Sequence, residues 1–204
     1  MKTLSYLAVV LGFELFLGGT AAQAGVVLDV VPATQTVLCC APFQVALQIS
    51  GLGSGVALGV FDVNLSFDPT LLAFDGATFG DPILGDQLDL EGFGTFSFFT
   101  PGTGTVELFE LSFDSPAALI ALQAHAFTLA TLTFNELDVI GVSPLGLSVY
   151  ALGDANGNSL AAQLVNGQVT TTPEPAISLL VACGLAGLGG AMWRRNRLGM
   201  RTQG

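Results

Sequence analysis

The chain has 204 residues, 51% of them apolar, and a formal net charge of −11. This length suits one globular domain with short flanking segments rather than two domains. Residues 25–172 contain 14 acidic side chains and no Lys or Arg, because the five basic residues lie near the chain ends. A segment without cations cannot neutralise phosphates, so we exclude nucleic acid as a partner. Its carboxylates must be solvated, hydrogen-bonded or bound to metal.

The first 24 residues have the organisation of a secretory signal peptide. Lys2 precedes an apolar run that ends at Leu17, and small residues follow it. Ala22 and Ala24 occupy the small-residue positions that signal peptidase requires before the cut. We therefore expect cleavage after Ala24 and export of the rest of the chain.

Residues 25–171 alternate apolar and polar side chains in short runs that Gly, Pro and Asp separate. The pattern predicts strands over 26–31, 43–49, 61–68, 95–99, 105–113, 126–135, 145–151 and 164–170, and a short helix over 116–122. Within 105–113 the apolar phase slips between Leu108 and Phe109, which predicts a β-bulge. The glycine-rich stretch 51–55 predicts a hairpin loop. Many short strands without a repeat favour an all-β, two-sheet sandwich.

Residues 172–204 contain three features in a fixed order. Pro173, Glu174 and Pro175 come first, and 18 residues without a charge follow over 176–193. A helix of that length reaches ~27 Å, slightly less than the ~30 Å hydrocarbon core, so we expect a short transmembrane helix. The basic cluster that follows should stay on the cytoplasmic side; it consists of Arg194, Arg195 and Arg197.

This arrangement resembles the PEP-CTERM sorting signal. The resemblance implies that an exosortase recognises the segment and removes the helix, so that membrane contact through 176–193 is transient. The protein would then pass from the cell envelope to the cell surface or the medium. A simple tail anchor, in which the helix is retained, is the alternative.

Residues 25–171 also resemble cohesin-like domains. The run from Leu58 to Leu72 is an amphipathic strand that leads into Phe67-Asp68-Pro69-Thr70-Leu71-Leu72, and the turn at 153–160 is followed by Val165-Asn166-Gly167-Gln168-Val169. The resemblance implies a jelly-roll sandwich, related in fold to carbohydrate-binding modules, whose family role is protein docking rather than catalysis.

Residues with the chemistry for catalysis or metal binding are few. His125 is the only histidine and precedes a predicted strand, so we expect it at the surface. Asp81, Asp86, Asp89 and Glu91 cluster in a loop, where solvated charges are favoured over a calcium site. No catalytic motif is present, and we do not expect an enzyme.

Asp154, Asn156 and Asn158 carry oxygen ligands at alternate positions, as calcium loops do. Position 12 of such a loop is Val165 instead of a glutamate, and Asn156-Gly157 is a strong hairpin turn by itself. Both interpretations stay open, so no cofactor other than calcium is considered. Cys39 and Cys40 are adjacent, which leaves a cross-chain disulfide and reduced or vicinally paired thiols as alternatives.

These observations predict a non-catalytic, exported interaction module that docks a protein partner or the exopolysaccharide. A carbohydrate-binding module is the alternative, but sugar platforms rely on Trp and Tyr. Tyr150 is the only tyrosine between Gly25 and Thr172, whereas that region has 13 phenylalanines. Four of them are crowded enough that some should form an exposed contact patch: Phe93, Phe96, Phe98 and Phe99.

Overall fold

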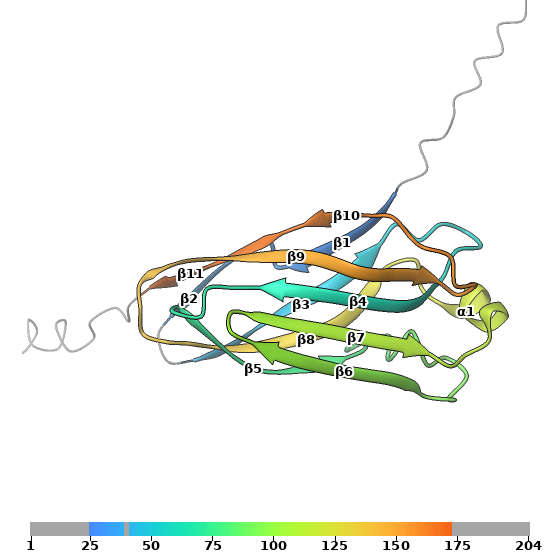
Figure 1. The fold of residues 1–204 in the computed structure, drawn as a ribbon, viewed down its shortest axis with the longest axis horizontal. Helices are drawn as coiled ribbons and strands as arrows, with labels where there is room; N and C mark the ends of the chain where they lie inside the picture. The colour runs from blue at the N-terminus through green and yellow to red at the C-terminus, as the bar shows by residue number, and fades with distance from the viewer. Residues whose placement is uncertain (1–24, 39–40, 173–204) are drawn as a thin grey trace, which may run out of the picture.

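The computed structural model describes residues 25–38 and 41–172, which form two β-sheets packed face to face (Figure 1). The predicted signal peptide, Cys39, Cys40 and the sorting segment from Pro173 onward lie outside these residues. The all-β sandwich predicted from the sequence is thus confirmed for the described part. Within that part, no helix has the length and apolar composition needed to cross a bilayer.

One sheet has five strands in the order β10-β1-β3-β8-β5. Its strands are β1 (Val26–Val31), β3 (Pro42–Ser50), β5 (Leu72–Phe79), β8 (Phe127–Glu136) and β10 (Ala162–Val165). The other sheet has six strands in the order β2-β11-β9-β4-β7-β6. Its strands are β2 (Thr34–Leu38), β4 (Leu58–Ser66), β6 (Thr95–Gly102), β7 (Thr105–Ser112), β9 (Gly141–Asp154) and β11 (Gly167–Thr172).

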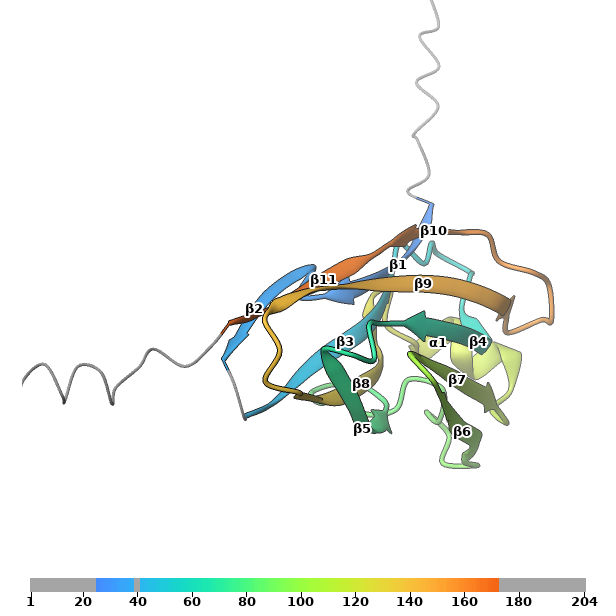
Figure 2. The same ribbon diagram turned by 60° about the vertical axis from the view of Figure 1, so that its left-hand side comes forward.

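The first and last strands of the domain lie together and close the sandwich. β1 pairs in parallel with β10 in one sheet, and β2 pairs in parallel with β11 in the other. The remaining strand pairs are antiparallel. Figure 2 shows β2 and β11 side by side at one edge of the molecule. Strands from the beginning and the end of the described segment are therefore hydrogen-bonded to each other in both sheets, as expected for a domain with its own core.

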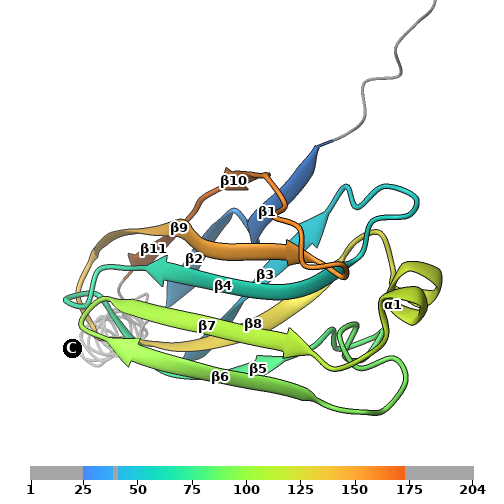
Figure 3. The same ribbon diagram turned by 45° about the vertical axis from the view of Figure 1, so that its right-hand side comes forward.

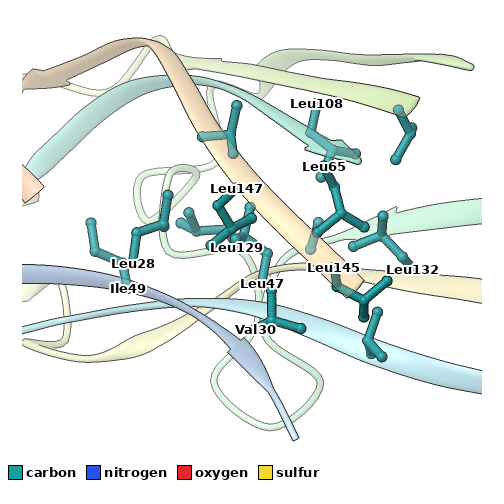
Figure 4. Close-up of a cluster of buried hydrophobic side chains, with 14 of the residues drawn as sticks. Leu28, Val30, Leu47, Ile49, Leu65, Leu108, Leu129, Leu132, Leu145 and Leu147 are labelled. Carbon is teal, nitrogen blue, oxygen red and sulfur yellow. The ribbon is translucent and has the colours of Figure 1, made fainter. Parts of the chain in front are cut away.

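The space between the sheets is filled by the inward side chains of alternate strand positions (Figure 4). Val30, Leu47 and Leu132 reach in from the five-stranded sheet, and Leu65 and Leu108 from the six-stranded sheet. A group of aromatic rings joins the two layers with ring centroids 5.1 to 5.8 Å apart, which adds to the stability from burial alone. Its members are Phe43, Phe67, Phe74 and Phe134.

The predicted helix is α1 (Pro116–Leu122), which begins with a standard cap. The Ser115 hydroxyl accepts a hydrogen bond from the Ala118 amide at 3.3 Å, and Pro116 occupies the first turn, where its missing N–H costs nothing. Leu119 is its one buried side chain. The helix lies at the end of the sandwich where β7 finishes (Figure 3).

Two local predictions were wrong, and two strands were missed. Strands β2 and β5 were not predicted, because each lies at a sheet edge and buries only a small part of its side chains. The glycine-rich stretch 51–55 is not a hairpin loop, since β3 and β4 on its two sides belong to different sheets. The register of β7 is continuous against both neighbours, so the predicted bulge is absent there.

The phase slip in β7 instead reverses which kind of side chain faces the core. Glu110 points inward and is buried, whereas Phe109 and Leu111 point outward. The register shifts that the described strands do contain lie in other pairs, at Leu47/Gln48, Phe74/Gly76, Leu58/Val60 and Asp62/Val63. The phase slip in β7 therefore places apolar side chains on the surface and an acid in the core, and leaves the backbone register unchanged.

Candidate interaction surface

The outer face of the six-stranded sheet carries an exposed group of phenylalanines. In β7 the buried positions are Val106, Leu108 and Glu110, so the residues that alternate with them, and their cross-strand neighbours in β6, face outward. Cα pairing aligns Phe96 with Leu111 and Phe98 with Phe109 across the two strands. We call these four residues the aromatic patch.

The rings of the aromatic patch contact one another. Phe98 stacks on Phe109 with centroids 5.1 Å apart, and Phe96 meets both rings at 5.7 and 6.1 Å. Phe96 is 55% exposed and Phe98 39%, at positions where a strand that faces solvent usually carries polar side chains. Contiguous exposed rings of this kind are typical of an interaction site.

The patch continues onto β4, which lies beside β7 in Figure 3, and onto β9 on the far side of β4. Val60 is paired with Leu111, and Asp62 lies between Phe109 and Ala151 in the next row. Tyr150 is 67% exposed at the irregular part of β9. With Val60 it lines a shallow hollow of about 300 Å³, which is large enough to take one side chain of a bound molecule.

Negative charge borders this apolar surface. Asp62 is half-buried, and its Oδ1 has no solvent contact and finds no hydrogen-bond partner among the described residues. Glu107 faces outward one row further along, paired with Thr100 and Asn64. A shielded carboxylate oxygen without a donor is costly in the free protein, and a cation from a bound molecule would relieve that cost.

Beneath the patch, Glu110 enters the interior from the same strand. It is 1% exposed, and its Oε1 accepts a hydrogen bond from the Thr95 hydroxyl at 2.9 Å. Burial, and then the charge of Asp86, raise the pKa of the Glu110 carboxyl to about 8. Glu110 thus occupies a core position where an apolar side chain is expected, just as Phe109 and Leu111 occupy surface positions where polar side chains are expected.

The acidic loop between β5 and β6 is fastened by hydrogen bonds rather than simply solvated. Asp81 accepts the amides of Ile83, Leu84 and Thr128 at 2.8 to 2.9 Å. Partial burial opposes them, but these bonds lower the pKa of Asp81. Asp86 accepts the Leu88 amide, Asp89 the Gly94 amide, and Glu91 the Ser115 amide. Each of the four carboxylates thus accepts at least one backbone amide, and the choice between solvated charges and a calcium site in this loop stays a prediction.

The residues proposed as a calcium loop form a turn in the structure. Asp154 accepts the amides of Asn156 and Asn158 at 2.9 and 2.7 Å, and Gly157 has φ = 83°. Bonds from the side chain and then the backbone of Asn158 lower the pKa of Asp154. The turn interpretation explains this geometry without an ion, and calcium binding at Asp154, Asn156 and Asn158 stays a prediction.

His125 is exposed, as the sequence predicted, and its carbonyl accepts the Leu52 amide at 3.2 Å.

The opposite face of the sandwich is polar: Gln44, Thr78 and Thr131 line a hollow of about 380 Å³ with Phe79 and Asp81. Gln44 is bonded to Thr133 and Asp81 accepts three amides, so these two side chains already have partners within the domain.

Comparison with solved structures identifies the fold as cohesin-like. The sixth cohesin of scaffoldin B from Acetivibrio cellulolyticus, solved with a Cel5 dockerin, superposes with a TM-score of 0.57 at 17% identity, covering 72% of this chain and 99% of the cohesin. A non-cellulosomal cohesin from Archaeoglobus fulgidus gives 0.55 at 14%, covering 74% and 94%. The cohesin module of a Clostridium perfringens family 33 glycoside hydrolase gives 0.53 at 14%, covering 74% and 97%. No protein-family model and no curated protein matches the sequence.

Sequence reasoning found part of this surface. It singled out Phe93, Phe96, Phe98 and Phe99, of which Phe96 and Phe98 belong to the aromatic patch. Phe99 is turned toward the five-stranded sheet, where its ring meets Phe74 at 5.6 Å. Phe109 and Leu111 were missed, because the phase slip that exposes them was interpreted as a bulge.

Proposed function

We propose that the chain is a non-catalytic docking module that binds a protein partner through the aromatic patch. The observation that carries the proposal is the group of three mutually stacked phenylalanines on an otherwise regular sheet face. Aromatic anchors contribute much of the affinity at protein interfaces. The likeness in fold to cohesins that were solved in complexes with dockerins agrees with this role.

The partner should present apolar side chains next to Lys or Arg. The described domain contains 14 acidic residues and no Lys or Arg, so it has no basic side chain of its own to pair with Asp62 or Glu107. A basic residue of the partner would pair with the half-buried carboxylate of Asp62 and pass over the neighbouring ring of Phe109, where a cation–π contact adds to the ion pair. Binding should therefore weaken as salt is added.

The exopolysaccharide is the alternative ligand, and the composition of the patch argues against it. Phe lacks the polar edge with which Tyr and Trp tolerate a wet sugar-binding surface. Only Tyr150, beside the hollow with Val60, offers that chemistry. A carbohydrate-binding module is therefore the second candidate.

We further propose that the protein is exported and sorted as the sequence indicates. An exosortase would recognise Pro173, Glu174 and Pro175, act on the segment that ends in Arg194, Arg195 and Arg197, and release the domain at the cell surface. Intact-mass measurement of protein from the cell surface should then give a chain that begins at Gly25 and lacks 176–193. A chain that retains 176–193 would support the tail anchor instead.

The docking proposal can be tested by photo-crosslinking in the cells that make the protein. A photoreactive phenylalanine analogue at position 98 should capture a protein partner. The same analogue at position 44, on the outer face of the five-stranded sheet, should not. The captured protein is then purified, and its affinity is measured with Phe98→Ser and with the control Gln44→Ser.

We expect Phe98→Ser to weaken binding more than tenfold, since a central aromatic anchor is worth ~2 kcal/mol or more. Gln44→Ser should leave the affinity unchanged. Capture of polysaccharide at position 98 would favour the carbohydrate-binding alternative. Equal capture at both positions would contradict a docking site on this face.

A further inference from the structure

An exposed apolar cluster lies at the end of the sandwich where β11 finishes. Figure 1 shows that β9 begins at this same end. The cluster combines the last residue of β2 with four residues from the segment that joins β8 to β9 and from the start of β9. All five side chains are between 43% and 70% exposed, and we call them the end cluster: Leu38, Leu137, Val139, Ile140 and Val142.

The last residues of β11 lie within this cluster. Thr172 is paired with Leu38 in the sheet. The Thr171 hydroxyl donates hydrogen bonds to the carbonyls of Val139 and Gly141. The end cluster is therefore directly beside the point at which the described part of the chain ends.

The loop that carries three members of the end cluster has backbone polar groups bonded inside the domain. The Leu137 amide donates to the Leu71 carbonyl at 3.0 Å, and the Val139 amide donates to the Glu136 carboxyl at 3.1 Å. These two amides add to the two carbonyls that Thr171 holds. A segment that enters an apolar layer needs internal partners for its backbone, and the loop supplies them for these four groups.

The sequence after Thr172 indicates what covers the end cluster. The uncharged segment 176–193, which its composition predicts to be a membrane helix, begins four residues further along. Four residues reach at most ~14 Å, and the headgroup layer on each side of the hydrocarbon core is ~5–8 Å thick. With the helix in a bilayer, Thr172 must then lie within roughly 10 Å of the headgroup surface.

We propose that the end cluster rests in the surface of the bilayer that holds segment 176–193, until that segment is removed. Exposed apolar side chains gain free energy in this layer, and the membrane segment removes the cost of bringing the domain there. The lipid surface should be neutral, because residues 25–172 contain 14 acids and no Lys or Arg, and anionic headgroups would repel them. The one acid within 137–142, Asp138, is exposed and can meet the ammonium group of phosphatidylethanolamine.

This contact would set the orientation of the domain on the membrane. The strands run away from the end cluster in Figure 1, so the sandwich would stand upright on the bilayer. The face of the six-stranded sheet would then point sideways and leave the aromatic patch open to a partner. The inference rests on the proposed membrane segment, but it does not depend on which molecule the aromatic patch binds.

The test uses the full chain reconstituted in vesicles of phosphatidylcholine and phosphatidylethanolamine. A photoreactive phenylalanine analogue is placed at position 140, and the mass of the irradiated protein shows whether a lipid has been added. The matched control carries the analogue at position 83, where Ile83 is 91% exposed in the loop between β5 and β6. That loop is bonded to Ser115 beside α1, at the other end of the sandwich.

We expect roughly tenfold more lipid adduct at position 140 than at position 83, because burial of the end cluster favours one orientation of the tethered domain. The analogue at position 142 should capture lipid as well, which gives a second measurement if the first substitution disturbs the loop. Ile140→Asn should lower the capture at position 142, whereas Ile83→Asn should leave it unchanged. Position 98, in the aromatic patch, should capture no more lipid than position 83.

Flotation of the vesicles separates a failure of this inference from a failure of the proposed membrane segment. A full chain that does not float with the vesicles would refute both. A chain that floats but captures no more lipid at positions 140 and 142 than at position 83 would refute the end-cluster contact alone. Lipid capture mainly at position 98 would place the aromatic patch against the bilayer, and would overturn both this orientation and the docking proposal.

Discussion

Glu110→Gln should make the protein more stable at pH 8 and reduce the dependence of its stability on pH. The pKa of Glu110 rises from 4.5 to about 8 on folding, through burial and the charge of Asp86. Between these two pH values the folded state holds a proton that the unfolded state has lost. The free energy of unfolding therefore falls as pH rises, and the loss is complete above pH 8.

The size of this loss in free energy of unfolding follows from the pH interval between the two pKa values of Glu110. Each pH unit removes at most ~1.4 kcal/mol, which sets an upper limit of ~5 kcal/mol between pH 4.5 and pH 8. Screening by solvent that reaches the loop lowers the expected loss to ~3 kcal/mol. Glutamine has nearly the same shape and stays neutral, so this contribution should disappear in the variant.

The measurement is urea unfolding at pH 5, 6, 7 and 8 in EDTA, for the wild type and for Glu110→Gln. The control is Glu107→Gln, which removes one charge from the same strand on its outer face. It corrects for the general repulsion within an acidic domain. Equal slopes against pH for the wild type and Glu110→Gln would refute the reasoning, because Glu110 would then titrate alike in both states.

Three further variants test the fold. Phe134→Ala should lower the free energy of unfolding by ~4 kcal/mol, because Phe134 is fully buried and contacts three other rings; urea unfolding measures this. Asp81→Ala should cost ~2 kcal/mol, since three amides lose their acceptor, and increased amide exchange at Ile83, Leu84 and Thr128 would show it. Gly104→Ala should lower the unfolding temperature, because φ is 71° there and the added Cβ would lie 2.9 Å from the carbonyl oxygen of Phe67. An unchanged unfolding temperature would contradict the positive φ and the close contact with Phe67 at position 104.

The sequence was informative where each strand buries one face and exposes the other. The run from Phe61 to Ser66 alternates strictly, and its inward residues Phe61, Val63 and Leu65 are all buried as predicted. It was uninformative at the edges. In β2 only Val37 is buried, so there is no period to detect. In β5 a register shift at Phe74/Gly76 breaks the alternation.

The candidate sites were harder to predict, for a related reason. Spacing along the chain does not show that Asp86 acts on Glu110, because the loop that carries Asp86 crosses from one sheet to the other between β5 and β6. The partners of Asp62 are likewise set by register between β4, β7 and β9. The sequence did contain the phase slip after Leu108. The structure shows that this slip turns Phe109 and Leu111 outward and Glu110 inward, and that it is not a bulge.

That slip links the aromatic patch to the buried acid beneath it, because one change of phase exposes Phe109 and Leu111 and buries Glu110. Natural sequences depart from regular patterning chiefly where function requires it. A variant that restores the alternation should therefore be more stable and less functional. Combining Phe109→Thr, Glu110→Leu and Leu111→Thr places a leucine of similar size in the core and polar side chains outside.

We expect this triple variant to gain ~2 kcal/mol in free energy of unfolding at pH 8 in EDTA, mainly because a buried carboxyl is replaced by an apolar group. It should also lose the capture of a partner at position 98. Urea unfolding and photo-crosslinking measure the two effects separately. A triple variant less stable than the wild type would mean that Glu110 supports the core of the free protein, and that the slip in β7 serves the fold instead of the surface.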